Sequence, residues 1–234
     1  MIKNFFPNKI LSLNITVVNS LILLLVIVII IGLIYSLLLS PPDYIQGDSV
    51  RIMYVHVPSS FMALGCFGFI GLASICNLIF KIKFMPLIAK SLAPIGFIFS
   101  LISIVTGSLW GKPTWGVWWA WDARLTSMTI LLFFYIAYIL TWKIVNNFDK
   151  ANSITSIIGI VGLLNIPVIK YSVYWWNTLH QPSSITLTSA PTIHYSMLVP
   201  LMIMFFGMLI YTLIIFLMRY KTEVIKFKIE KKKN

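Results

Sequence analysis

The chain has 234 residues, of which 59% are hydrophobic and only 10% are charged, and its formal net charge is +12. A soluble domain carries about 25% charged residues, so this composition indicates a membrane protein and excludes a cytosolic enzyme. The length suits a single polytopic membrane domain covering residues 1–234.

Six apolar stretches follow one another along the chain, each long enough to cross a hydrocarbon core of about 30 Å. They predict an all-α integral membrane protein, a bundle of six transmembrane helices. The first stretch is too long for the apolar region of a signal peptide and no small-residue cleavage pattern follows it, so we interpret it as a retained helix. The helices are expected near residues 17–39, 57–80, 91–109, 125–142, 152–170 and 195–217.

The basic residues predict the orientation of this bundle. With six spans, both termini and the second and fourth loops share one side of the membrane, and all but four of the 18 basic residues fall there. The positive-inside rule therefore places both termini in the cytoplasm or the mitochondrial matrix. Topology and contact with anionic membrane lipid also account for the basic C-terminal tail, so no nucleic acid is expected as a partner. The four exceptions are Arg51, Lys112, Arg124 and Lys170.

The first, third and fifth loops then face the opposite compartment, and the unusual residues gather in them. The first loop places His56 just before Pro58, which we expect in the first turn of the second helix, and the fifth loop holds His180. A lone interfacial histidine is more often a hydrogen-bonded surface residue than a ligand, and Arg51 and Arg124 could be simple interfacial anchors. The convergence of two histidines, two arginines and seven tryptophans on one face nevertheless favours a binding site there.

The third loop reads WGKPTWGVWWAWDARLTS from residue 110 to residue 127 and holds five of the eight tryptophans of the chain. One interpretation is a short surface helix that anchors the loop in the membrane plane, since Trp115, Trp118 and Trp119 have helical spacing. The other is a broad, flat apolar surface suited to a planar macrocycle. We expect Asp122 to pair with Arg124 and to hold the loop in place.

The two cysteines do not indicate redox or metal chemistry. Cys66 and Cys76 lie in one apolar run, about 15 Å apart along a helix. A disulfide needs Cα atoms within about 7 Å, so they cannot form one. The chain has no C-x-x-C motif, and we interpret both residues as part of the core.

The segment WGKPTWGVWWAWDARLTS resembles the tryptophan-rich WWD signature of a family of haem-handling membrane proteins. The segments PPDYIQGDSVRIMYVHVP and WWNTLHQ narrow the resemblance to the CcmC family of cytochrome c maturation (system I), and the resemblance covers nearly the whole chain. The sequence departs from the family pattern at Lys170 and Tyr174, where some relatives have His and Glu. His194 has no counterpart in the family's ligand pair, so we expect a structural role for it.

The resemblance implies that haem b binds transiently at the outer face, with His56 and His180 as axial ligands of the iron. The WWD loop, near residues 110–124, is then expected to support the macrocycle, and Arg51 or Arg124 suits the propionates. The loop residues expected at the site are Trp110, Trp115, Gly116, Trp118, Trp119, Trp121 and Asp122.

The resemblance also implies delivery of haem rather than enzymatic catalysis. Members of the family are understood to present haem to the haem chaperone CcmE, in association with the small membrane protein CcmD and the ABC-transporter subunits CcmA and CcmB. The expected location is the bacterial inner membrane or the mitochondrial inner membrane, with the site facing the periplasm or the intermembrane space. Two alternatives are a haem-transporting subunit of an ABC-type complex and a membrane scaffold that binds no haem.

Overall fold

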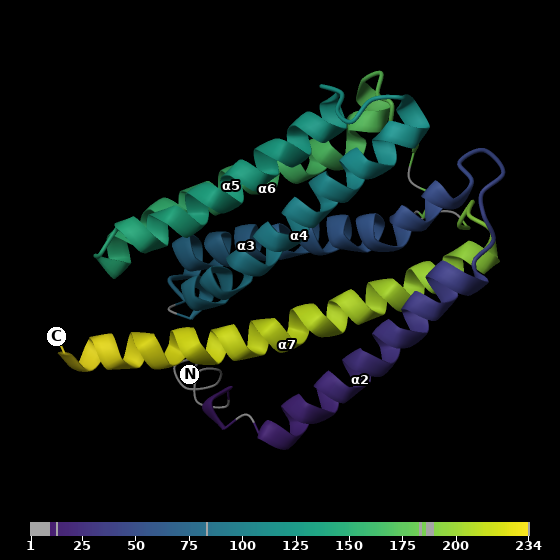
Figure 1. The fold of residues 1–234 in the computed structure, drawn as a ribbon. Coiled ribbons are helices and arrows are strands. Elements are labelled where there is room, and N and C mark those ends of the chain that lie inside the picture. Colours follow the sequence, from purple (N-terminus) through teal and green to yellow (C-terminus); the bar gives the residue numbers. More distant parts are fainter. Residues whose placement is uncertain (1–9, 13, 83, 183, 186–189, 234) are drawn as a thin grey trace.

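The computed structural model describes residues 10–12, 14–82, 84–182, 184–185 and 190–233 (Figure 1). Within these residues, six helices are long and apolar enough to cross a membrane, which confirms the predicted architecture and the number of spans. We call the end of the bundle where α2 starts and α7 ends the terminal end, and the opposite end the loop end. The helices are α2 (Ile15–Ile34), α3 (Met53–Phe80), α4 (Met85–Trp115), α5 (Ala123–Ile144), α6 (Phe148–Trp175) and α7 (Tyr195–Lys233).

Two short helical segments connect α2 to α3. A π-helical turn, η1 (Tyr35–Leu39), continues α2, and a 3-10 turn, η2 (Asp48–Ile52), leads directly into α3. As a result α3 begins at Met53, four residues before the start that the apolar pattern predicted. His56 therefore lies inside the first turn of the helix and not in the loop before it, and the helix fixes the direction of its side chain.

Helix α4 is also longer than predicted, because it continues past residue 109 to Trp115. Trp110 and Trp115 thus belong to a helix, and the WWD loop is confined to residues 116–122, which form bends and irregular chain. The short surface helix proposed for Trp115, Trp118 and Trp119 is wrong. Gly116 ends α4 in the left-handed conformation, with φ of 78° that an L side chain rarely adopts, and so prevents the helix from continuing.

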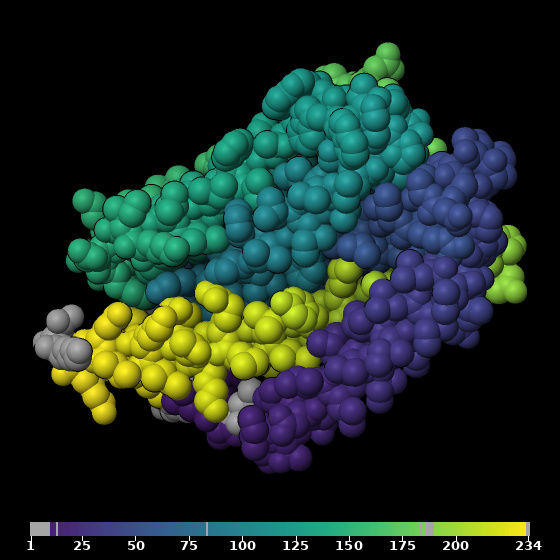
Figure 2. Space-filling model, in the orientation of Figure 1, coloured from purple at the N-terminus to yellow at the C-terminus, as the bar shows by residue number. Residues whose placement is uncertain are grey.

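The helices form two groups. Helices α3, α4, α5 and α6 pack on one another, whereas α2 packs on α7, which in turn contacts α3 and α4. Figure 1 shows α2 and α7 on one side of the four-helix group, and the space-filling view shows the same division (Figure 2).

The four-helix group is held by a core of fully buried side chains that include Phe67, Ile70 and Leu131. Tyr135 of α5 is also fully buried and donates a 2.6 Å hydrogen bond to the carbonyl of Ala63 in α3. Within a membrane no water competes for such a donor, so this bond helps to set α5 against α3. The packing fixes how α3, α4, α5 and α6 meet at the loop end, where the candidate site lies.

Candidate functional site

His56 is held by two groups on the facing side of α4. Its Nδ1 atom lies 3.0 Å from the carbonyl oxygen of Ser103 and 3.1 Å from Oγ1 of Thr106. A carbonyl oxygen only accepts hydrogen bonds, so Nδ1 carries the proton and the neutral ring has its free lone pair on Nε2. No described residue donates a hydrogen bond to Nε2. This arrangement, in which a backbone carbonyl fixes the tautomer, is typical of histidines that bind metal through the other nitrogen.

The imidazole of His56 fits into a space that a glycine provides. A Cβ atom on Gly107 of α4 would lie 2.9 Å from Cε1 of His56, closer than real Cβ contacts allow. One turn of chain further, the indole of Trp110 meets the imidazole edge-on, with ring centroids 5.8 Å apart. Trp110 is itself fixed by a 2.8 Å hydrogen bond from Nε1 to Oε1 of Gln46 in the first loop. The ring of His56 is thus bounded on several sides.

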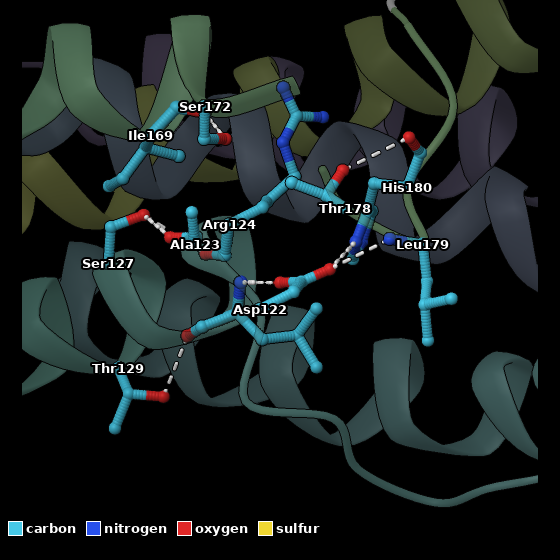
Figure 3. A network of polar contacts seen from close by, with 11 residues as sticks. Asp122, Ala123, Arg124, Ser127, Thr129, Ile169, Ser172, Thr178, Leu179 and His180 are labelled. Carbon is cyan, nitrogen blue, oxygen red and sulfur yellow. Dashed lines mark hydrogen bonds and ion pairs between the residues drawn. The ribbon is translucent and has the colours of Figure 1, made fainter. Parts of the chain in front are cut away.

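His180 is held in the same way by a carboxylate. Its Nδ1 atom lies 3.4 Å from Oδ2 of Asp122, which also accepts from the backbone N–H of Leu179 at 3.3 Å (Figure 3). The other oxygen of Asp122 accepts from the N–H of Leu125 at 2.8 Å and so caps the start of α5. A carboxylate partner again places the proton of the imidazole on Nδ1 and leaves Nε2 for a metal.

The environment of Asp122 keeps its carboxyl group ionised at neutral pH. Burial by itself raises the pKa of Asp122, but the hydrogen bonds from His180 and from the N–H groups of Leu125 and Leu179 outweigh it, so the pKa lies below its ordinary value. Asp122 is therefore a fixed negative charge behind His180. Its side chain is only 8% exposed, so the interaction is shielded from water.

The expected pairing of Asp122 with Arg124 is wrong. Figure 3 shows the carboxylate of Asp122 directed toward His180, while the guanidinium of Arg124 points away from it. Arg124 donates instead from NH2 to the carbonyl of Lys170 in α6, at 3.2 Å. The reason is geometric, because residues two apart at a helix start face different directions and the capping role of Asp122 fixes its side chain. The Nε atom of Arg124 is buried without a hydrogen-bond partner among the described residues.

The last turns of α4 contact both histidines. Trp115 packs edge-on against His180, with ring centroids 4.8 Å apart, just as Trp110 packs against His56. The two tryptophans are five residues apart, which corresponds to about 7.5 Å along the helix. One helix end therefore contacts both the start of α3, which carries His56, and the fifth loop, which carries His180.

The remaining tryptophans of the WWD loop fall into two groups. Trp118 and Trp121 are exposed, with 55% and 79% of their surface accessible, whereas Trp119 is partly buried. The indole of Trp119 meets that of Trp121 edge-on at 5.5 Å, and its buried Nε1 has no partner among the described residues. The loop path is fixed by Ser108, whose hydroxyl donates to the carbonyl of Trp118 at 2.7 Å.

Gly116 and Lys112 hold the transition from α4 into this loop. The positive φ of Gly116 is required there, and Nζ of Lys112 donates to the Gly116 carbonyl at 3.0 Å. Gly116 therefore has a conformational role in positioning the WWD loop.

Arg51 is engaged away from the two histidines. Its Nε pairs with Asp48 at 3.0 Å, and its NH1 donates to the carbonyls of Ser36, at 3.1 Å, and Leu37. These carbonyls lie at the π-helical end of α2, where the backbone needs donors. No described hydrogen bond or ion pair joins Arg51 to the other expected site residues.

Among the described residues, His194 contacts its own neighbours at the start of α7. Its Nδ1 accepts from the backbone N–H of Ser196 at 3.3 Å and lies 2.8 Å from the Ser196 hydroxyl. This placement agrees with the structural role expected for it.

Sequence reasoning missed the residues that hold His56. Ser103, Thr106 and Gly107 lie three and four residues apart, so they share one face of α4. That spacing was visible, but small and hydroxylated residues on a membrane helix usually serve helix packing, and only the contact with His56 distinguishes these.

Comparison with known proteins identifies the family of the chain. The family model described as "Heme exporter protein C" matches residues 2–234. Heme exporter protein C of Haemophilus influenzae is 41% identical over 196 residues, which cover 84% of this chain and 80% of the relative. The protein of the same name from Escherichia coli K12 is 40% identical over 195 residues, 83% of this chain and 78% of the relative.

A relative from a plant extends the comparison beyond bacteria. The putative cytochrome c biosynthesis ccmC-like mitochondrial protein of Marchantia polymorpha is 40% identical over 198 residues, 84% of this chain and 83% of its own. The match to the family model, over residues 2–234, spans all six membrane helices and the loops between them. The chain therefore belongs to the heme exporter protein C (CcmC) family of cytochrome c maturation.

Proposed function

We propose that this integral membrane protein binds haem at its loop end between His56 and His180 and presents it to the haem chaperone CcmE. The observation that supports the proposal most is that the two imidazoles have the same hydrogen-bonding arrangement. Each has Nδ1–H engaged with an acceptor, the Ser103 carbonyl or the Asp122 carboxylate, and each has Nε2 without a described partner. Two neutral imidazoles are a suitable axial pair for haem iron and need no cysteine.

The residues around the histidines suit the rest of the haem molecule. The indoles of Trp115 and Trp119 offer apolar surface for a porphyrin. Arg124 is the better candidate for a propionate, because its buried Nε has no hydrogen-bond partner among the described residues. Arg51 is less suited, since its Nε is bonded to Asp48 and its NH1 to carbonyls at the end of α2.

The exposed indoles support a role in presentation. Trp118 and Trp121 are both exposed in the WWD loop, and exposed aromatic side chains that lie close together are typical of protein interfaces. We assign them to contact with CcmE or to the haem edge that CcmE receives. CcmD and the subunits CcmA and CcmB are the further partners that this proposal includes.

The asymmetry of basic residues supports one orientation in the membrane. We infer that both termini lie in the cytoplasm or the mitochondrial matrix and that the loop end faces the periplasm or the intermembrane space. This places the bound haem on the side where cytochromes c are assembled.

The axial ligands are tested by haem titration of the purified protein. The wild-type chain should give the absorption spectrum of a six-coordinate low-spin haem, and the double variant His56→Ala, His180→Ala should lose it, because no second imidazole pair is available. His194→Ala is the matched control and should bind as the wild type does. An unchanged Soret band in the double variant would contradict the proposal, and so would its absence in the wild type, as expected for a scaffold.

Propionate recognition is tested by comparing haem with its dimethyl ester, which lacks the carboxylates. Arg124→Gln should weaken haem binding about tenfold or more, the effect of losing a charge-assisted hydrogen bond. The same variant should bind the ester as the wild type does. Arg51→Gln is the control and should leave the haem affinity unchanged. The assignment fails if Arg124→Gln weakens both ligands equally, or if Arg51→Gln has the larger effect on haem alone.

Presentation is tested by covalent loading of CcmE in cells. The double variant Trp118→Ala, Trp121→Ala should retain haem, because neither indole packs on His56 or His180, yet it should load CcmE several-fold less. Trp175→Ala removes an indole of similar exposure, 56%, from the end of α6 and serves as the control. Normal loading by the double variant at normal protein levels would refute the presenting role and leave the transporter alternative.

A further inference from the structure

A groove lies between α4 and α7 toward the terminal end, away from the candidate haem site. Its volume is about 190 Å³, and its walls are mainly apolar, with Pro94 and Ile98 on α4 and Tyr211 and Ile215 on α7. Pro94 lacks a backbone N–H and so interrupts the hydrogen-bond ladder of α4 at this level. The two helices run side by side here in Figure 1, and they are in contact.

Arg219 stands at one end of this groove, and among the described residues only its Nε atom donates a hydrogen bond. Its Nε donates to the carbonyl of Ser91 on α4 at 3.2 Å, which fixes the guanidinium beside the apolar walls. The nearest carboxylate along the helix, Glu223, pairs instead with Lys90 at 2.8 Å and with Lys226 at 3.7 Å. Among the described residues, no carboxylate forms an ion pair with Arg219.

The position of Arg219 along α7 corresponds to the depth of lipid phosphates. Arg219 follows the first residue of α7, Tyr195, by 24 residues, which is about 36 Å of helix, compared with a hydrocarbon thickness of about 30 Å. Tyr211 lies eight residues earlier, about 12 Å deeper. The groove therefore extends from the headgroup level into the hydrocarbon layer.

We propose that this groove binds one anionic phospholipid, with its phosphate on Arg219 and an acyl chain along Ile98, Ile215 and Tyr211. The guanidinium, which pairs with no described carboxylate, can supply two or more N–H donors to a phosphate, and Lys90 and Lys226 together carry one positive charge more than Glu223 compensates. A zwitterionic lipid brings its own cation into this basic surrounding and is bound less well. The proposal does not depend on haem binding.

The site is tested by native mass spectrometry of the full chain, with equal amounts of phosphatidylglycerol and phosphatidylcholine in the detergent solution. The wild type should retain phosphatidylglycerol selectively. Arg219→Gln should reduce this selectivity about fivefold, the contribution of one interfacial cation. Lys231→Gln removes an equal charge from an exposed position of the same helix and should have no such effect. An equal loss of selectivity in both variants would indicate that the basic C-terminal tail attracts anionic lipid in general, and it would overturn the proposal.

A second variant tests the groove without changing any charge. Ile98→Trp places a larger side chain in the groove and should also abolish the selectivity for phosphatidylglycerol. This variant remains informative even if Arg219→Gln proves too unstable to purify. Unchanged binding in Ile98→Trp would exclude an acyl chain in the groove. Inorganic phosphate added in excess should not displace the lipid, and displacement would identify a site for a free ion rather than for a phospholipid.

Discussion

The candidate site depends on the contact between the end of α4 and the two histidines. Trp110 packs against His56 and Trp115 packs against His180, while the preceding turn supplies the acceptor and the space for His56. The histidines belong to segments more than a hundred residues apart in the chain. A rigid helix end is therefore what gives two loop-end residues a defined mutual position, and α4 is rigid there because it packs on α3 and α5.

In the proposed site, each imidazole has its Nδ1 atom next to a hydrogen-bond acceptor, but the two acceptors differ in charge. A neutral carbonyl holds His56, whereas an ionised carboxylate holds His180. A carboxylate partner makes an imidazole the more basic ligand, so the two sides of the iron would differ in ligand strength. His180 is also carried by a loop, whereas His56 is carried by a helix start. Such asymmetry would suit a haem that has to be released, because the bond to His180 on the loop could break before the bond to His56 on the helix.

The helices were predictable from sequence because a membrane span needs a long apolar run, and all six runs are where the pattern places them. The ends of the helices were not predictable in the same way. Residues 48–56 and 110–115 are polar or aromatic enough to suggest loops, yet η2 and the last turns of α4 are helical because they pack on neighbouring elements. Tertiary contact overrides the local pattern there.

For the candidate site, the sequence indicated which residues to consider but not how they pair. His180 and Asp122 are in contact, whereas Arg124, the charge nearest in sequence, is not the partner of Asp122. Capping of α5 turns that carboxylate toward the fifth loop, a direction that only the fold determines. Arg51 donates to backbone carbonyls at the π-helical turn that ends α2. No sequence motif predicts that turn, so this pairing could not be expected from the sequence.

The most direct test of this account is the coordination of the iron itself. Electron paramagnetic resonance of the ferric, haem-loaded chain, with histidine labelled by ¹⁵N, reports both the spin state and the ligand nuclei. We predict a low-spin signal coupled to two histidine nitrogens in the wild type, and a high-spin signal in either single variant, His56→Ala or His180→Ala, because one axial imidazole alone does not hold the iron low-spin. A high-spin signal in the wild type, or a low-spin signal that survives both substitutions together, would contradict the pairing of His56 with His180 at the end of α4.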